Sequence, residues 1–335
     1  MTEKIEDRDS QIILLGKDRS TIQRFVAFGA ILVVYFFYCY NFMLGTFVRP
    51  TLTAAIANGG FGFTLQQAEG IFAVMSFGTI PGTILFGMLA SRIGKKRGLI
   101  VIALCIGITT FLPLLNPASF TFWRATRFLA GFSLGGVFGT AVPLVTEMFP
   151  QRYRGKLAAI LTSTFSVAMI FAGQLYGFLG DANWRFLVYT AAIPPLVGAV
   201  LIFLTVPDDY RLMQERRSNA AQQGKGISYF SMYQGKYLFI GIGVILLSGL
   251  NFVGYSSYAN NATKFLRDGL GMSAAVAGGI YSLQGIGQLI GYNIWGFIAD
   301  RFGRKIPALG MLLCSVLIYA FLQLLNFLFM CHTKP

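Results

Sequence analysis

Long apolar runs alternate with short charged segments along this chain, and that alternation limits the possible folds more than any other feature. A run of about 18 or more apolar residues is long enough to cross a bilayer as a helix. β-Strands of a membrane barrel would instead alternate apolar and polar residues, which these runs do not do. We therefore expect an all-α polytopic membrane protein. Nine runs contain no Asp, Glu, Lys or Arg: Phe25–Val48, Gly70–Ser91, Gly98–Trp123, Phe128–Thr146, Leu157–Gly180, Phe186–Pro207, Tyr237–Thr263, Gly269–Ala299 and Ile306–Thr333.

The charged residues lie in the gaps between the runs. Only 12% of the residues are charged, but the net charge is +14. Most of the Lys and Arg residues fall in alternate gaps, which are the cytoplasmic ones if Met1 is cytoplasmic. Basic loops are retained on that side of a membrane, so the excess records topology and does not indicate nucleic-acid binding. We expect an integral protein of the plasma (cell inner) membrane with a cytoplasmic N-terminus and the lipid bilayer as a partner.

Residues suited to metal or covalent chemistry are scarce. The chain has four Cys and one His, His332, which lies near the C-terminal end. A zinc site needs several such ligands at characteristic spacing, and none is present. Neither a phosphate-binding loop nor a nucleophile triad occurs. We expect no metal, no cofactor and no enzymatic activity.

The longest polar segment, residues 207–236, separates six apolar runs from three. Its charges and its Gly and Gln content are typical of a linker between two helical bundles. The predicted order is a cytoplasmic tail over 1–24, a six-helix bundle over 25–206, a cytoplasmic linker over 207–236 and an incomplete, about three-helix bundle over 237–335.

One charged sequence occurs twice at corresponding places. GMLASRIGKK begins at Gly87, after the second run, and GFIADRFGRK begins at Gly296, after the eighth. The copies are about 210 residues apart, and the first and seventh runs keep nearly the same offset. Such a repeat indicates two like-oriented bundles related by an axis along the membrane normal, an arrangement found in secondary transporters.

The second copy resembles the hallmark loop of the major facilitator superfamily, Gly-x-x-x-Asp-Arg-x-Gly-Arg-Lys, which lies between helices 2 and 3 and again between helices 8 and 9. The first copy has Ser91 where the pattern has Asp. The segment Arg127–Gly155 is similar to the signature of sugar porters and aromatic-acid symporters that covers helix 4 and the loop after it. NWRFLVY resembles the Trp-Arg entry of helix 6 in that branch, and VPDDYRLM resembles the Pro-Glu-Ser-x-Arg exit after helix 6, with Asp208 in place of Glu. The resemblance implies a major-facilitator-like fold and a transport function.

Two departures from the family pattern stand out. Aromatic-acid symporters carry an Asp-Gly-aromatic-Asp cluster in helix 1, where this chain has YCYN, Tyr38 to Asn41. The chain also ends at Pro335, where the pattern would continue through helices 10 to 12. We therefore expect a C-terminally truncated relative that lacks the coupling acids of that branch.

The repeated hairpins and the loop after the fourth run form a candidate gating motif. Glycine lets two helices reverse within a few residues, and the hairpin Asp can cap the next helix or pair with Arg. In the alternative reading, the basic residues only anchor the topology or lie in solvated loops. The candidate gating residues are Gly87, Arg92, Gly94, Glu147, Arg154, Gly296, Asp300, Arg301, Gly303 and Arg304.

Arg127 is the most informative single residue, because an arginine inside a span is paired, snorkels to the surface or binds an anion. It could reach the outer headgroups beside Arg124, clamp a carboxylate substrate with bidentate hydrogen bonds, or form a structural pair. Other polar side chains within the runs either bind substrate or join helices. The candidate substrate-binding residues are Tyr38, Asn41, Arg127, Gln174, Asn251, Gln284 and Gln288.

Gly131, Gly135 and Gly139 recur at every fourth position of the fourth run. Small residues at that spacing predict a close approach between two helices.

The function we expect is secondary-active or facilitative transport of a small organic solute by alternating access. An organic or aromatic acid is preferred because of Arg127, and a sugar comes next. Strong proton symport needs an acidic residue along the path, and no Asp or Glu lies inside the runs, so it is disfavoured. The coupling partner that we expect is a proton or no ion. The alternative is a truncated, non-transporting remnant or isoform of such a carrier.

Overall fold

The computed structural model describes most of the first two thirds of the chain and part of the remainder. The described residues through Gly285 form one compact unit, and those from Ile286 onward form another. No strand occurs among the described residues, which confirms the all-α prediction. The structure describes Leu15, 19–222, 238–239, 241–243, 246, 249–250, 261–302, 309–310 and 313.

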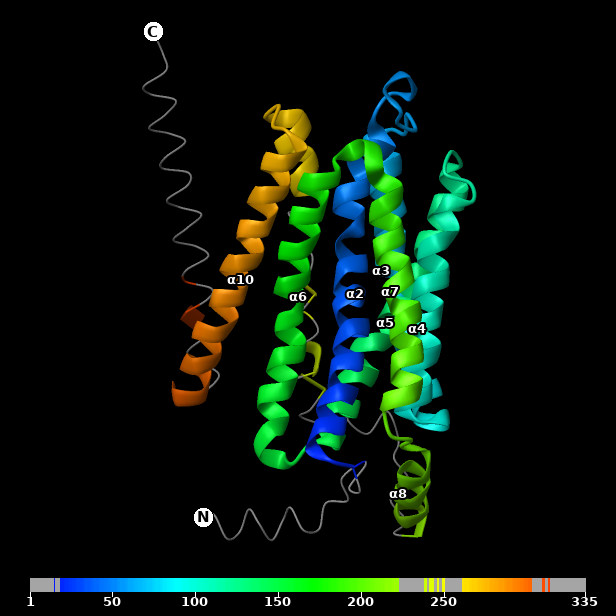
Figure 1. Cartoon of the computed structure of the whole chain (residues 1–335), viewed down its shortest axis with the longest axis vertical. Coiled ribbons are helices and arrows are strands. Elements are labelled where there is room, and N and C mark those ends of the chain that lie inside the picture. Colours follow the sequence, from blue (N-terminus) through cyan, green and yellow to red (C-terminus); the bar gives the residue numbers. More distant parts are fainter. Residues whose placement is uncertain are drawn as a thin grey trace. The chain divides into compact units, whose positions relative to one another are not determined.

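Six long helices lie within residues 21–205, and each corresponds to one of the first six apolar runs. All six are long and apolar enough to cross a membrane. They run side by side along the vertical axis of Figure 1. The helices are α2 (Thr21–Thr53), α3 (Leu65–Ile93), α4 (Lys95–Phe111), α5 (Phe120–Met148), α6 (Gln151–Leu179) and α7 (Trp184–Thr205).

Shorter elements lie between and after these helices. The eighth predicted run corresponds to α10, whereas the seventh and ninth lie largely outside the described residues. The linker expected over 207–236 begins with the helix α8. The shorter elements and the last helix are η1 (Ile56–Asn58), η2 (Leu112–Leu114), η3 (Asp181–Asn183), α8 (Tyr210–Gln222), the π-helical turn η5 (Phe265–Gly269) and α10 (Ala274–Phe302).

The unit through Gly285 has two ends, which differ in their contacts. At one end α3 turns into α4, α5 turns into α6, and α7 leads to α8, as Figure 1 shows. We call this the α8 end. At the other end α2 finishes and η3 joins α6 to α7, and we call this the η3 end. Several of the helices begin or end at these two ends next to polar capping side chains or glycines.

The starts of α2, α3 and α4 can be traced to local sequence. Ser20 and Gln23 form a capping box at the start of α2, and Thr64 and Gln67 form one at the start of α3. Each box satisfies amide groups that the first helical turn leaves without partners. Gly94 has a φ of 97°, a conformation open mainly to glycine, and it separates α3 from α4 as the hairpin sequence predicted.

Small residues allow two of the six helices to approach each other closely. α3 lies along α5, α4 packs against α5 and α7, and α2 packs against α6 and α7. A Cβ atom on Gly131 would lie 1.9 Å from the Met75 carbonyl oxygen, and one on Gly135 would lie 2.4 Å from that of Thr79. These two positions confirm the predicted close approach, here between α5 and α3. At Gly139 no described atom lies within 4 Å of such a Cβ.

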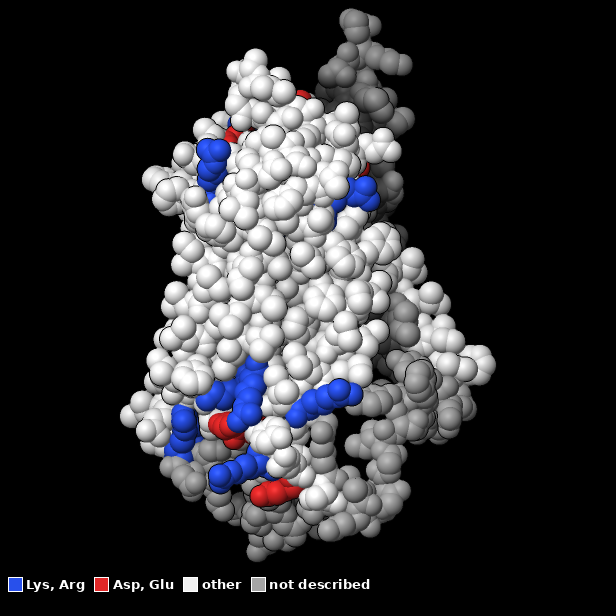
Figure 2. Space-filling model, turned by 90° about the vertical axis from the view of Figure 1, so that its right-hand side faces the viewer, with Lys and Arg blue, Asp and Glu red and all other residues white. Residues whose placement is uncertain are grey.

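The outer surface of the helices suits a hydrocarbon environment. Figure 2 shows a face with a broad middle band that carries no charged side chains, and Lys, Arg, Asp and Glu gather near the two ends. Large apolar side chains such as Phe77 on α3, Ile108 on α4 and Phe203 on α7 are exposed on the six helices. Exposure of so much apolar surface to water would be strongly unfavourable, whereas the hydrocarbon chains of a lipid bilayer are a matching solvent for it.

Candidate functional site

At the α8 end, Asp209 caps the helix that comes after the first charged hairpin. Its carboxylate accepts hydrogen bonds from the backbone amides of Lys95, at 2.6 Å, and Lys96, at 3.1 Å. These are the first amides of α4, which lack partners inside the helix and carry the positive end of its dipole. Asp209 is only 3% exposed. The hairpin lacks its expected acid because Ser91 occupies that position, and the buried Asp209 supplies a carboxylate from beyond α7.

Two ion pairs flank this cap. Lys95 pairs with Glu147 at the end of α5, at 2.6 Å, and Arg97 pairs with Asp208 at 2.7 Å. The Arg97 guanidinium also lies over the Tyr210 ring, 4.9 Å from its centroid. The pairs connect the α3–α4 turn to α5 and to the segment that leads into α8.

The environment of Asp208 lowers its pKa. Partial burial acts to raise the pKa of this carboxyl group. The hydrogen bonds from Arg97 and from the Tyr210 amide, together with the charges of Arg97 and Lys96, outweigh that effect. The pKa of Asp208 therefore lies below its ordinary value, and the carboxylate stays ionised at neutral pH.

The remaining candidate gating residues lie in or beside the two hairpins and after α5. Gly87 and Arg92 are exposed on α3, and Arg154 donates to the Phe149 carbonyl at 3.0 Å. In the second hairpin, Arg301 is exposed at the end of α10. Gly296 and Asp300 lie within α10, where only their backbone is described, and Gly303 and Arg304 lie outside the described residues. Gating by these residues stays a prediction.

Arg127 is buried among the helices and does not reach the surface. It is 1% exposed, whereas Arg124, one helical turn away, is exposed and lies over the Phe120 ring. The snorkelling that was one alternative for Arg127 therefore applies to Arg124 only. Arg127 donates to the Thr110 carbonyl at 3.4 Å and lies over Trp123, 5.7 Å from the ring centroid.

These partners compensate the Arg127 charge only in part. Thr110 lies in the last turn of α4, where the helix dipole places partial negative charge. The Arg127 Nε has no hydrogen-bond partner among the described residues, and none of their carboxylates forms an ion pair with Arg127. A buried donor without a partner costs about 1–3 kcal/mol. The site thus keeps a buried cation with unused hydrogen-bonding capacity.

Asn41 connects three helices. Its amide nitrogen donates to the Phe37 carbonyl of α2 and to the Ala191 carbonyl of α7, both at 2.9 Å. Its Oδ1 accepts a hydrogen bond from the Thr110 hydroxyl of α4 at 2.7 Å. Both donor hydrogens of the amide are in use, so this geometry supports the helix-joining alternative. The place where the resemblance expects an acid is occupied by a neutral side chain that fastens α2 to α4 and α7.

The other candidate substrate-binding residues are not gathered around Arg127 by any contact among the described residues. Tyr38 packs against Tyr35 and Phe42 within α2. Gln174 is exposed on α6. Gln284 and Gln288 are partly buried, and each has an Oε1 with no partner among the described residues. Asn251 lies outside the described residues. A substrate role for each of these side chains stays a prediction.

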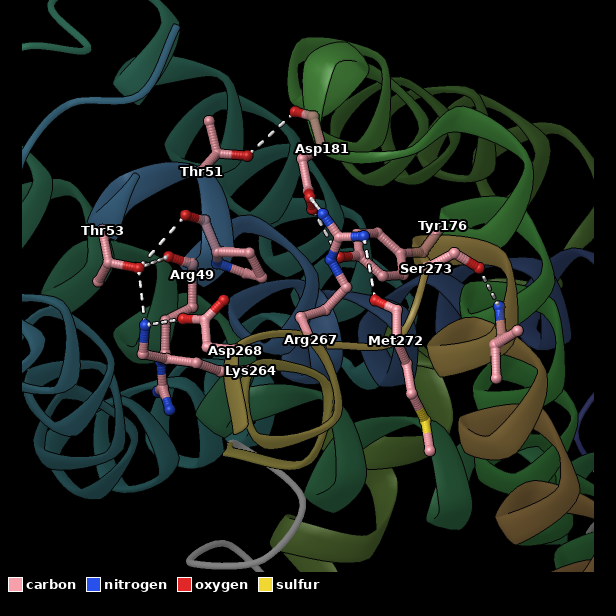
Figure 3. Close-up of polar contacts among 12 residues, drawn as sticks. Arg49, Thr51, Thr53, Tyr176, Asp181, Lys264, Arg267, Asp268, Met272 and Ser273 are labelled. Atoms are coloured by element: carbon pink, nitrogen blue, oxygen red, sulfur yellow. Dashed lines mark hydrogen bonds and ion pairs between the residues drawn. The ribbon is translucent and has the colours of Figure 1, made fainter. Parts of the chain in front are cut away.

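The η3 end carries a polar cluster that sequence reasoning did not find. Figure 3 shows Asp181 at its centre, with Tyr176, Arg267 and Thr51 directed toward it. The Tyr176 hydroxyl hydrogen-bonds to Asp181 Oδ1 at 2.5 Å, and Arg267 forms an ion pair with Oδ2. Thr51 donates to the Asp181 carbonyl at 3.0 Å.

A second part of the same cluster, also visible in Figure 3, is centred on Lys264. Its ammonium group pairs with Asp268 at 2.5 Å and donates to the Thr53 hydroxyl at 3.0 Å. Arg49, buried near the end of α2, donates to the Asn261 side chain. The cluster thus joins α2, α6 and η3 to residues 261–273.

The sequence did contain a weak signal for this cluster. Asp181, Lys264, Arg267 and Asp268 are charged residues at the borders of apolar runs, all on the side predicted to be opposite the linker. Their pairing depends on folding, because Asp181 and Arg267 are separated by 86 positions. Composition alone could not select these partners.

Comparisons with known proteins identify the family to which the chain is similar. A sequence profile of the Major Facilitator Superfamily matches residues 26–332. The cis,cis-muconate transport protein of Acinetobacter baylyi is 30% identical over 68% of this chain and 56% of its own length. The glucose transporter GlcP of Staphylococcus epidermidis is 25% identical over 77% of this chain and 64% of its own length. The chain spans less than two thirds of either relative.

Solved structures show the same fold. The crystal structure of a D-xylose–proton symporter matches with a TM-score of 0.62 at 20% identity, over 83% of this chain and 69% of that one. A partially occluded, inward-open structure of the xylose transporter XylE from E. coli matches with a TM-score of 0.64 at 18% identity, over 85% of this chain and 73% of that one. Because these identities are 20% or less, the likeness concerns the arrangement of the helices, that is, the fold.

Proposed function

Because the chain belongs to the Major Facilitator Superfamily, we propose that it is a carrier that moves a small organic solute across a membrane by alternating access. It is an integral membrane protein whose six described spans match the fold of solved carriers. Relatives that align over most of the chain are named for transport of an organic acid and of a sugar. This support favours a carrier over the non-transporting alternative.

The solute class that we propose is a small organic anion, preferably an aromatic or unsaturated carboxylate. The observation that carries this choice is the buried Arg127 with its unpartnered Nε. A carboxylate would supply the missing acceptor through a charge-assisted hydrogen bond and would neutralise the buried cation. The cis,cis-muconate transport protein, a relative, is named for a dicarboxylate.

A sugar is the second candidate. The buried Oε1 of Gln284 has no partner among the described residues and could accept a hydrogen bond from a sugar hydroxyl. The glucose transporter GlcP is among the relatives, and solved xylose carriers share the fold. An uncharged solute would leave the Arg127 charge uncompensated, so we rank it below an anion.

Coupling and orientation can be inferred from the charges. The nine apolar runs contain no Asp or Glu that could carry a proton midway through the membrane. We propose facilitated or weakly coupled transport, with a proton or no ion as the coupling partner. The basic residues around Lys95 and Arg97 favour placing the α8 end in the cytoplasm, on the inner side of the plasma membrane.

The test uses the full chain, purified and placed in lipid vesicles. Labelled benzoate and a labelled hexose are offered separately, and uptake and equilibrium binding are compared with empty vesicles. We expect benzoate binding to weaken by roughly tenfold or more in Arg127→Gln, because a charge-assisted hydrogen bond contributes about 1.5–3 kcal/mol. Arg124→Gln is the matched control, since that side chain is exposed one turn away on α5.

Arg127→Lys shows whether a positive charge alone is enough. Lys keeps the charge but cannot form a bidentate contact, so we expect intermediate affinity. Each variant must also unfold at nearly the wild-type temperature for its binding to be compared. Equal losses in Arg124→Gln and Arg127→Gln, or hexose uptake without benzoate uptake, would contradict the anion proposal. No uptake of either solute would contradict the carrier proposal.

A further inference from the structure

We propose that Asp181 and Arg267 form a lock that holds the η3 end closed, and that separating this ion pair opens that end. The proposal rests on the proposed function, because such a lock acts only in a chain that opens alternately at two ends. It assigns a role to residues outside both the predicted hairpin motif and the Arg127 site. The lock has a fixed side and a moving side.

The fixed side belongs to the first six helices. Asp181 begins η3, directly after α6 ends, and Tyr176 holds its Oδ1 from within α6. Thr51, near the end of α2, holds the Asp181 carbonyl. Tyr176 is fully buried and packs against Phe47 of α2, with ring centroids 5.1 Å apart. The carboxylate of Asp181 is therefore held in place before Arg267 binds, which reduces the entropy lost in forming the pair.

The moving side is the segment of residues 261–273. Arg267 lies in the π-helical turn η5, and its guanidinium also donates to the Met272 carbonyl at 3.4 Å. Lys264 and Asp268 pair within the same segment. π-Helical turns are rare in proteins, and many of those that occur lie at functional sites. These internal contacts keep the shape of the segment when it separates from the six helices.

Polar contacts cross between the two sides, in addition to apolar packing. Arg267 pairs with Asp181, and Arg49 donates to Asn261. The Lys264 ammonium donates to the Thr53 hydroxyl, and the Thr263 hydroxyl donates to the Thr46 carbonyl at 2.5 Å. Opening of the η3 end must break these contacts and can spare the internal ones.

Among the described residues, Asp181–Arg267 is the ion pair that crosses between the two sides. Their side chains are 26% and 27% exposed. Burial of that degree reduces screening by salt relative to an exposed surface pair.

Helix packing beside the lock shows how completely this end is shut. A Cβ atom on Gly278 of α10 would lie 2.3 Å from the Gly173 carbonyl oxygen of α6. The two helices therefore touch backbone to backbone at this point. Tyr281, farther along α10, packs edge-on against Phe47, with ring centroids 5.0 Å apart. Asp181 follows the end of α6, so the lock lies beyond this close contact between α6 and α10.

The arrangement also explains how the lock can reopen. When Arg267 leaves, Asp181 keeps the hydrogen bond from Tyr176 and gains access to water. Arg267 keeps the Met272 carbonyl as a partner. Neither charge is then buried without a partner, so the cost of opening stays within reach of ligand binding.

The experiment measures hydrogen exchange of residues 261–273 and 176–183 in the full chain, purified in lipid nanodiscs. Asp181→Asn, Arg267→Gln and the double variant are compared with wild type. Exchange in these segments reports the fraction of molecules that are open. We expect each single variant to raise exchange by roughly tenfold, which corresponds to about 1.4 kcal/mol. The double variant should exchange no faster than the faster single variant, because both substitutions break one contact.

Two matched controls separate the lock from general loss of charge. Asp268→Asn removes an acid from the pair that lies within the moving segment, and Arg185→Gln removes an exposed cation at the η3 end. We expect exchange in both controls to stay within about twofold of wild type. Unchanged exchange in Asp181→Asn and Arg267→Gln, multiplication of their effects in the double variant, or an equal effect of Asp268→Asn would each overturn the lock.

The readout does not depend on a substrate. If the variants behave as expected and no solute binds, the lock stands as a contact and the carrier proposal fails. If benzoate binds through Arg127 and the exchange of the variants is unchanged, the lock alone fails.

Discussion

The α8 end and the η3 end of the unit through Gly285 differ in the contacts that their charged residues make. At the α8 end, Asp209 caps α4, Lys95 pairs with Glu147, and Arg97 pairs with Asp208. All these contacts lie within residues 95–209. At the η3 end, the Asp181–Arg267 ion pair joins the six helices to residues 261–273. The contacts at the α8 end join the six helices to one another, while those at the η3 end join the six helices to residues 261–273, where we have proposed a lock.

The largest expected effect comes from the turn at the α8 end. Gly94→Ala places a side chain at a φ of 97°, with its Cβ only 2.8 Å from Asp209 Oδ1. We expect a loss of about 2–3 kcal/mol in the free energy of unfolding, because the backbone is strained and the cap is displaced. Thermal unfolding of the purified protein measures it. Gly87→Ala is the control, since no described atom lies within 4 Å of its Cβ; equal effects of the two would refute the explanation.

The next effect is loss of the cap itself. Asp209→Ala removes the acceptor for two buried amides, and we expect a loss of about 1–2 kcal/mol. Asp209→Asn keeps one carbonyl oxygen and should fall between Asp209→Ala and wild type. Hydrogen exchange of the first turn of α4 should rise, while that of residues 261–273 should not. A rise in both regions would show that the two ends are coupled and that the comparison is wrong.

Removal of the Lys95–Glu147 pair should have a smaller effect. The two side chains are 28% and 18% exposed, so solvent screens the pair only in part. We expect Glu147→Gln to lower the free energy of unfolding by about 1 kcal/mol. The Lys95→Met, Glu147→Gln double variant serves as the control, because it should lose little more than the single one. Full additivity would mean that the two residues act separately.

The smallest effect concerns Asp208 and is revealed by pH. Its pKa is lower in the folded chain than in the unfolded one, so the Asp208–Arg97 pair stabilises the fold above the unfolded value of about 3.9. That contribution is lost as the pH falls through the folded pKa. Both side chains are about half exposed, and we expect less than about 1 kcal/mol.

The pH effect is measured as the gap in unfolding temperature between wild type and Asp208→Asn. The gap should be present at about pH 7 and should shrink as the pH falls below the ordinary carboxyl pKa of about 3.9. In an Arg97→Gln background the gap at pH 7 should be smaller, because Arg97 is lost while the Tyr210 amide and the Lys96 charge remain. A gap that grew on acidification would have the wrong sign for a lowered pKa.

Much of the fold could be predicted from the sequence. Charge-free runs set the six described spans, since their length matches the bilayer, and Gly94 marked the turn between two helices. Gly131 and Gly135 indicated the α3–α5 contact because only small residues allow such an approach. These features depend on local sequence or on short periods, which a single chain displays directly.

The site was predicted less completely, because its contacts join distant parts of the chain. Asp209 is 114 positions from Lys95, and nothing local shows that it replaces the acid missing at Ser91. The sequence marked Arg127 as unusual, but its burial and its contact with the end of α4 depend on how the helices pack. For Asn41 the sequence left two alternatives open, substrate binding and helix joining, and its hydrogen bonds to three helices depend on the packing.

The central claim is that a carrier binds an anion at Arg127 and transmits that binding to the η3 end. Hydrogen exchange of residues 261–273, measured with and without saturating benzoate, tests it most directly. The account predicts that benzoate changes this exchange in wild type and in Arg124→Gln but leaves it unchanged in Arg127→Gln. An identical response in Arg127→Gln, or no response in wild type, would contradict it.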